Sequence, residues 1–142
     1  MKKSIIWTIV GVLLVLSLMS CDNNEEQKEI DAKYHGKWEI QRMQNRTDNL
    51  PLPVVLNGEL IKAAGYIITA TSIERYYDGI PVFSVSNVYS KHYEGGESEI
   101  MDLDSDLSVG FSLNVEGQTL EWTQTYPFFK HICTKVSRFS WE

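Results

Sequence analysis

The amino-acid sequence predicts an all-β domain of eight short antiparallel strands behind an N-terminal leader. Two observations support this fold class. Apolar and polar residues alternate with a period of two, which places one face of a strand in the core and the other in solvent. Turn residues such as Asp78-Gly79 and Gly95-Gly96 separate the apolar runs at short intervals. Many short strands with this spacing are typical of a barrel or a sandwich.

The first 20 residues have the pattern of a secretory leader. Lys2 and Lys3 are followed by an apolar stretch of 15 residues, from Ile5 to Met19, and this order of charge and hydrophobicity is typical of a signal peptide. The apolar stretch is shorter than the ~20 residues that a membrane-spanning helix needs. We therefore expect residues 1–20 to be removed. An uncleaved anchor is the less favoured alternative.

The leader ends in Leu18-Met19-Ser20-Cys21, which resembles the lipobox of bacterial lipoproteins. In that family Leu18 and Ser20 would be read by the signal peptidase, which cuts before the cysteine. The resemblance implies that Cys21 carries a thioether-linked diacylglycerol and an amide-linked acyl chain such as palmitate, with no other cofactor. Two or more chains hold a protein stably on a membrane, whereas one chain binds reversibly. The resemblance therefore predicts a lipid-anchored protein of the bacterial cell envelope.

Residues 21–33 form a polar, acidic segment without periodicity, which predicts a flexible tether between the lipid and the domain. An acidic run after the lipidated cysteine resembles a surface-export signal, and an Asp directly after it resembles an inner-membrane retention signal. The outer membrane or the cell surface is favoured, and the inner membrane stays open. Without Lys2 and Lys3 the chain has 11 basic and 19 acidic residues, a net charge near −8. This balance excludes nucleic acid as a partner.

The strongest strand signal lies in LSVGFSLNVEG, residues 107–117, whose apolar positions alternate with polar residues or glycine. Glu116-Gly117 supplies a turn, and QTLEWTQTY returns as the second strand of a hairpin. The six other expected strands are Gly36–Met43, Tyr66–Thr69, Ile73–Tyr77, Val82–His92, Ser98–Leu103 and His131–Ser140.

One connection is unusually long. Residues 44–64 separate the first two expected strands, and Asn57 is placed to cap a helix of two turns that Gly65 ends. Long connections in compact domains are commonly functional. We interpret this segment as a flap at one end of the barrel that governs the entry of a ligand.

Gly36-Lys37-Trp38, at the start of the first strand, is similar to the G-x-W of lipocalin-like (calycin-type) proteins. In that family the tryptophan closes the base of an eight-stranded barrel, and a basic residue from the last strand packs across it. The resemblance implies that Arg138 fills this role and that the long first connection covers the mouth. It also implies that residues 34–142 form one lipocalin-like barrel domain, in the manner of divergent bacterial lipoproteins.

No pattern predicts catalysis or a metal site, so we do not expect an enzyme. The aspartates of DLDSDL, residues 102–107, alternate as calcium ligands do, but leucines occupy the positions where a calcium loop has Gly and Glu. The three histidines have no spacing typical of a zinc site. Cys133 is expected to be a small buried apolar residue.

The aromatic residues favour a binding function. Tyr66, Tyr89, Phe111 and Trp122 are the expected lining of an interior pocket, because tyrosine and tryptophan combine apolar faces with a polar tip. In the alternative interpretation the rings simply fill the core, and an eight-stranded barrel allows either. The first hypothesis is a membrane-anchored binder of a small apolar or amphipathic ligand, without chemistry. The second is a filled barrel that binds an envelope protein as a subunit or an inhibitor.

Overall fold

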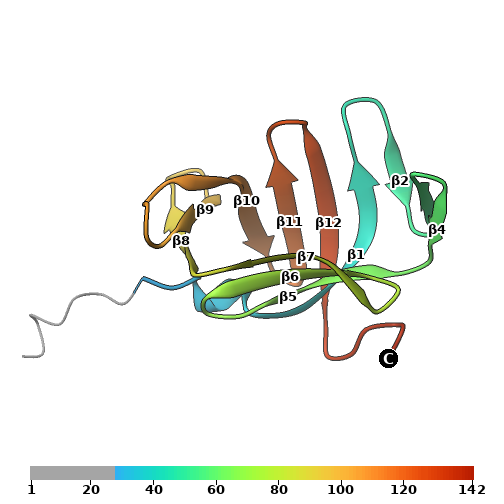
Figure 1. The fold of residues 1–142 in the computed structure, drawn as a ribbon, viewed down its shortest axis with the longest axis horizontal. Coiled ribbons are helices and arrows are strands. Elements are labelled where there is room, and N and C mark those ends of the chain that lie inside the picture. Colours follow the sequence, from blue (N-terminus) through green and yellow to red (C-terminus); the bar gives the residue numbers. More distant parts are fainter. Residues whose placement is uncertain (1–27) are drawn as a thin grey trace, which may run out of the picture.

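The computed structural model describes residues 28–142, which fold into an all-β, antiparallel and nearly closed barrel (Figure 1). The only helix in this part of the chain is a single 3-10 turn, η1 (Ala32–Tyr34). The strands in chain order are β1 (Gly36–Gln44), β2 (Asn49–Pro51), β3 (Val54–Leu56), β4 (Glu59–Ile61), β5 (Ala64–Ile68), β6 (Ser72–Tyr77), β7 (Ile80–Ser86), β8 (Val88–His92), β9 (Ser98–Asp102), β10 (Ser108–Glu116), β11 (Thr119–Gln124) and β12 (Phe129–Val136).

Neighbouring strands of the barrel are mostly neighbours in sequence. The hydrogen-bonded order is β7-β6-β5-β1-β12-β11-β10-β9-β8, and β2 pairs with β1 beside this path. Strand β1 pairs with the last strand, β12, so the sheet curves back on itself and few backbone edges are left unpaired. The remaining opening lies between β7 and β8, which only Asn87 separates. In Figure 1 the β5–β7 strands run across the view, and β1, β11 and β12 stand upright.

The first residues of the described part help to bridge this opening. The backbone N–H of Ile30 donates to the Ala70 carbonyl at 2.7 Å, and the N–H of Ser90 donates to the Glu29 carbonyl at 3.3 Å. The Ile30 side chain is 1% exposed and belongs to the core. Residues 29–33, which we assigned to the tether, are therefore part of the packed structure. Residues 28–142 thus share one hydrophobic core.

The expected number of strands is wrong. Nine strands form the hydrogen-bonded path and β2 adds a tenth, where eight were expected. The difference arises at Asn87, whose φ of 59° lies in the left-handed region and interrupts the expected strand Val82–His92. The segment before Asn87 pairs with β6 and the segment after it pairs with β9. One expected strand thus becomes two strands with different neighbours.

The expected helix after Asn57 is also wrong. Asn57 and Gly58 have φ values of 50° and 83°, as a two-residue type I′ turn requires, and they join β3 to β4 in a hairpin. An Asn-Gly pair between apolar residues favours this hairpin over a helix cap. Val54 and Ile61 of the hairpin are each 6% exposed and lie in the core cluster. The long first connection therefore packs against the core.

Candidate functional site

One end of the interior is completed by Trp38. Its side chain is fully buried, and its indole N–H donates to the Tyr34 carbonyl at 2.8 Å. The Tyr34 hydroxyl lies 2.8 Å from the Ser98 hydroxyl oxygen and 3.2 Å from the Leu113 carbonyl oxygen. The Trp38 indole N–H and the Tyr34 hydroxyl thus both find their hydrogen-bond partners within the chain. We call the layer formed by Trp38 and Tyr34 the base, and its role is structural.

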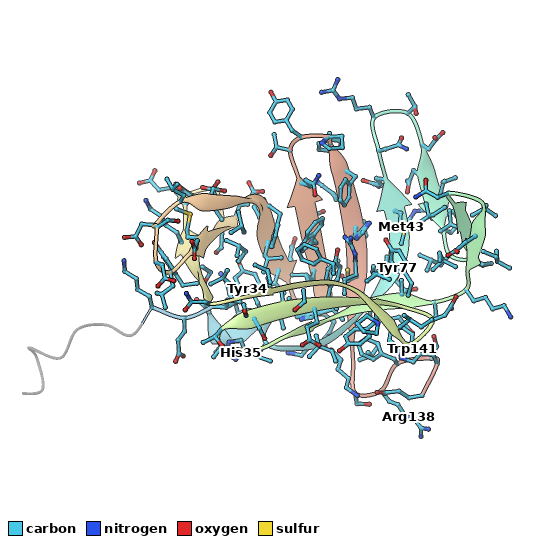
Figure 2. All side chains as sticks on the ribbon, in the orientation of Figure 1. Tyr34, His35, Met43, Tyr77, Arg138 and Trp141 are labelled. Carbon is cyan, nitrogen blue, oxygen red and sulfur yellow. The ribbon has the colours of Figure 1, made fainter. Side chains whose placement is uncertain are left out.

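The basic residue over Trp38 is Lys135, and the assignment of this role to Arg138 is wrong. Trp38 and Lys135 are register partners in the β1–β12 ladder, so their side chains leave the same face of the sheet. The Lys135 ammonium lies 5.1 Å from the indole centroid and donates to the His35 carbonyl at 3.0 Å. Arg138 follows the end of β12, is exposed and bonds the Glu142 carbonyl, and Figure 2 shows it pointing away from the barrel.

Three of the four expected pocket residues meet in the interior. The ring centroids of Tyr66 and Trp122 lie 5.5 Å apart, and those of Phe111 and Trp122 lie 4.8 Å apart. Each of these side chains is at most 5% exposed. Tyr89 is not among them: its strand neighbour Val88 lies in the core, so the alternation of side chains turns Tyr89 to the opposite face. There its hydroxyl donates to an Asp106 carboxylate oxygen at 2.8 Å.

Arg75 completes this interior layer, and the sequence analysis missed it. It is the register partner of Tyr66 across β5 and β6, and its guanidinium carbon lies 5.2–5.9 Å from four ring centroids. The rings are those of Tyr66, Tyr77, Phe83 and Trp122. A signal was present in the sequence, because Arg75 occupies an inward position of an alternating strand.

The groups around Arg75 add no negative charge. Arg75 Nη1 donates to the Tyr66 hydroxyl oxygen at 3.3 Å, and that hydroxyl lies 2.7 Å from His131 Nδ1. Burial, reinforced by the positive charge of Arg75, lowers the pKa of His131 from 6.5 to about 3. Burial raises the pKa of Tyr66 well above its usual value. Both side chains are neutral near pH 7, so Arg75 carries the only charge of this layer.

Two buried hydrogen-bond donors of this layer have no partner. They are Arg75 Nε and Trp122 Nε1, and no other buried side-chain nitrogen or oxygen among residues 28–142 lacks a hydrogen bond. Arg75 forms no ion pair either, since the ion pairs of the described part join Lys28 to Asp106, Lys37 to Glu142 and Lys130 to Glu121. Leaving a buried donor unsatisfied costs about 1–3 kcal/mol. We call this layer the Arg75 cluster; it consists of Arg75, Tyr66, Tyr77, Phe83, Trp122 and His131. The described residues do not supply acceptors for all of its buried donors.

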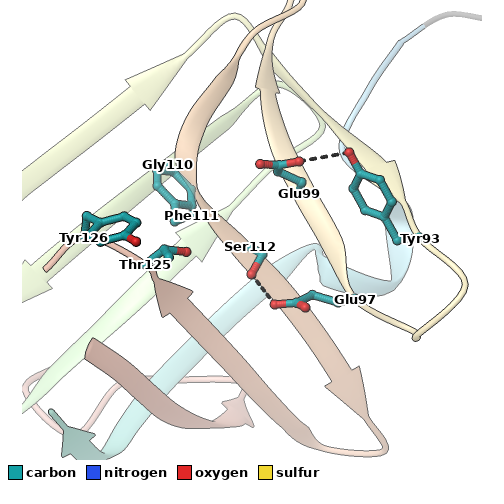
Figure 3. Close-up of a pocket in the computed structure, with 8 residues that line it drawn as sticks. All are labelled: Tyr93, Glu97, Glu99, Gly110, Phe111, Ser112, Thr125 and Tyr126. Atoms are coloured by element: carbon teal, nitrogen blue, oxygen red, sulfur yellow. Dashed lines mark hydrogen bonds between the residues drawn. The ribbon is translucent and has the colours of Figure 1, made fainter. Parts of the chain in front are cut away.

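A pocket of about 470 Å³ opens in the barrel wall beside this cluster (Figure 3). The register of β9 against β10 is interrupted between Ser108 and Ser112, and Gly110, with φ of 94°, contributes no side chain there. The pocket therefore reaches Phe111, whose ring contacts Phe83 and Trp122. Its lining consists of Tyr93, Glu97, Glu99, Gly110, Phe111, Ser112, Thr125 and Tyr126.

Polar groups line the outer part of this wall pocket. The Tyr93 hydroxyl donates to a Glu99 carboxylate oxygen at 2.9 Å, and the Ser112 hydroxyl donates to Glu97. Tyr126 is 84% exposed. No residue of the 44–64 connection lines this pocket. A second pocket, of about 410 Å³, is lined by Asn45, Arg46 and Thr47 of that connection together with Pro127 and Phe128.

The aspartates of residues 102–107 and Cys133, the other candidate groups in the sequence, make local hydrogen bonds or are buried in the core. Among residues 28–142, no three His, Cys, Asp or Glu side chains are grouped to hold a metal ion. Asp102 accepts a hydrogen bond from the Ser105 hydroxyl at 2.9 Å, and Asp104 accepts one from the Asn87 amide at 2.8 Å. Cys133 is fully buried, and burial raises the pKa of its thiol.

Leu18, Ser20 and Cys21 lie outside the described residues. Within residues 28–142, no helix has the length and apolar character needed to cross a membrane. Comparison with protein-family models, curated proteins and solved structures found no match for this chain.

Proposed function

We propose that this protein is a lipid-anchored, lipocalin-like barrel that binds a small amphipathic molecule and performs no chemistry on it. The wall pocket is the observation that carries this proposal. Its volume of about 470 Å³ falls within the ~300–1,000 Å³ of typical small-molecule sites. Its apolar floor, Phe111, packs on Trp122 at a centroid distance of 4.8 Å. Phe111 therefore belongs both to the pocket lining and to the aromatic cluster of the interior.

The lining indicates how such a molecule would be held. Phe111 and the rings of Tyr93 and Tyr126 offer apolar contact, and the carboxylates of Glu97 and Glu99 accept hydrogen bonds. A ligand with an apolar body and a hydroxyl group that reaches the rim matches both parts. Sites of this kind derive most of their affinity from apolar contact and their orientation from a few polar groups.

The pocket is tested by filling it. We expect residues 22–142, which contain the whole described unit, to bind the uncharged dye N-phenyl-1-naphthylamine with a rise in dye emission that 1-octanol reverses. Thr125→Trp places a large side chain in the pocket lining and should reduce the affinity at least about tenfold. Thr134→Trp, on exposed β12 surface, is the matched control and should bind normally. Equal binding by both variants would contradict a site in the wall pocket.

The envelope location is part of the same proposal and rests on the Leu18–Cys21 motif. Cys21→Ala removes the thiol to which the diacylglycerol would be attached. The variant should leave the membrane fraction, as seen by fractionation of cells expressing the full chain. A variant that stays on the membrane would indicate an uncleaved apolar leader.

A second candidate function is the binding of another envelope protein. Val55 and Leu60 are register partners on the outer face of the β3–β4 hairpin, and they are 63% and 54% exposed. Adjacent exposed apolar side chains are a common feature of protein-binding surfaces. Replacing both residues by threonine should weaken crosslinking to such a partner in cells and leave dye binding in the wall pocket unchanged.

A further inference from the structure

We propose that the Arg75 cluster is an oxyanion site that binds a carboxylate group, through the Arg75 guanidinium and the Trp122 indole N–H. This site is distinct from the polar rim of the wall pocket, and it goes beyond the proposed function because it specifies a charged group in the barrel interior. The inference rests on the charge of Arg75, on two buried donors without acceptors and on the neighbouring position of these two side chains.

The charge of Arg75 is uncompensated within the described residues. An arginine side chain stays protonated in proteins, and burying a charge without a counter-charge is costly. The ring faces of Tyr66, Phe83 and Trp122 attract the guanidinium. A ring face is a weak hydrogen-bond acceptor and does not replace an oxygen atom as the partner of a guanidinium N–H. Among the described groups only the Tyr66 hydroxyl accepts a hydrogen bond from the Arg75 guanidinium.

The unpartnered groups are all donors. Arg75 Nη1 already bonds Tyr66, whereas Arg75 Nε and Trp122 Nε1 have no acceptor in the described residues. The guanidinium carbon lies 5.5 Å from the Trp122 ring centroid, so the two unpartnered donors belong to neighbouring side chains. Trp122 is only 1% exposed, so bulk solvent does not supply the missing acceptor. The ligand group must accept hydrogen bonds and carry negative charge.

A carboxylate matches this requirement best. The Arg75 guanidinium is the only charge of the layer, so it can neutralise one negative charge. A phosphate dianion would leave one negative charge unbalanced in an aromatic environment. A carboxylate is planar and presents two acceptor oxygens, the geometry that arginine binds well. Arg75 itself is half-buried, and its Nε is buried without a partner.

Two sources can supply a carboxylate: a small free acid, or the head group of an alkyl acid. Phe111 forms the floor of the wall pocket and contacts Phe83 and Trp122, and both of those rings flank Arg75. An alkyl chain attached to a carboxylate at Arg75 would therefore find apolar surface next to it.

The test follows the indole N–H resonances of residues 22–142 in proton–nitrogen correlation spectra. The Trp122 resonance is assigned with Trp122→Phe. Sodium acetate, sodium octanoate, 1-octanol and sodium chloride are the added probes. We expect a saturable shift of the Trp122 resonance with a carboxylate and none with chloride. The Trp38 resonance is the internal control, because its N–H is already bonded to the Tyr34 carbonyl.

Arg75→Gln should weaken carboxylate binding at least about tenfold, since hydrogen bonds to charged groups contribute about 1.5–3 kcal/mol. Arg138→Gln makes the same chemical change at an exposed position outside the barrel and should bind as the unaltered chain does. Arg75→Lys keeps the positive charge but lacks the planar guanidinium, so it should retain the fold and bind carboxylates weakly. This variant tests the site even if Arg75→Gln unfolds.

The outcomes separate this proposal from the proposed function. Tighter binding of octanoate than of acetate supports an alkyl acid as the source, and equal binding supports a small free acid. Binding of 1-octanol without any carboxylate shift would overturn the oxyanion site and leave the wall pocket in place. A carboxylate shift that persists in Arg75→Gln, or that chloride reproduces, would also overturn it.

Discussion

The base of the barrel and the Arg75 cluster each contain a buried tryptophan, and the two tryptophans differ in one respect. Trp38 and Trp122 are 0% and 1% exposed. The Trp38 N–H donates to the Tyr34 carbonyl at 2.8 Å, whereas the Trp122 N–H has no partner in the described residues. Both layers also carry a cation against an indole, Lys135 in the base and Arg75 in the interior.

The difference separates a layer whose hydrogen bonds are complete from a layer in which two buried donors lack acceptors. In the base, the chain itself supplies an acceptor for every group named above, including the His35 carbonyl for Lys135. In the Arg75 cluster, donors outnumber acceptors. Folded proteins pair nearly all of their buried polar groups, and the two neighbouring donors without partners are the feature on which the proposed oxyanion site rests.

The largest expected effect is the pH dependence that His131, in the Arg75 cluster, gives to the free energy of unfolding. Its pKa in the folded state, about 3, lies below the usual 6.5, so the unfolded chain binds the proton first as the pH falls. The stability that this group contributes is present above about pH 6.5 and is lost towards pH 3, by at most about 1.4 kcal/mol per pH unit.

Urea unfolding from about pH 7 to about pH 5, above the range where most carboxylates titrate, measures this loss. His131→Phe should remove most of the slope. His92→Gln, which changes an exposed histidine, should keep it. A slope that is the same in the His131 variant and the unaltered chain would mean that other groups cause it.

The second effect compares the two tryptophans directly. Trp38→Phe and Trp122→Phe remove the same volume, but only the first breaks a hydrogen bond and leaves the Tyr34 carbonyl without its donor. The free energy of unfolding should fall by about 1–3 kcal/mol more for Trp38→Phe than for Trp122→Phe. Urea unfolding at pH 7 measures both variants. Equal losses would show that Trp122 has an acceptor after all.

The smallest effect concerns the cation over Trp38. Lys135→Gln removes the charge that lies 5.1 Å from the indole centroid and should lower the free energy of unfolding by about 0.5–1 kcal/mol. Arg138→Gln should change it by less than about 0.5 kcal/mol, as surface substitutions commonly do. Chemical unfolding of both variants tests the assignment. A larger loss for Arg138→Gln would restore that residue to the base.

Local patterns in the sequence were sufficient for much of the fold. The hairpin around Gly117 is confirmed, because β10 and β11 pair antiparallel on either side of it, with Leu113 opposite Trp122. Strand alternation and turn chemistry act over a few residues, and they are therefore legible in a single sequence. The same local signals were misread at Asn57 and Asn87, where asparagine adopts the left-handed conformation.

The sequence by itself determined the all-β class, the hairpin around Gly117 and the inward position of Trp122, because period-two alternation fixes which side chains share a face. Only the tertiary structure decided which residues meet, since the register between β1 and β12 joins residues about a hundred positions apart and places Lys135 over Trp38. The same closure gathers four rings around Arg75. Whether a buried donor finds an acceptor depends on this long-range geometry, which no local pattern encodes.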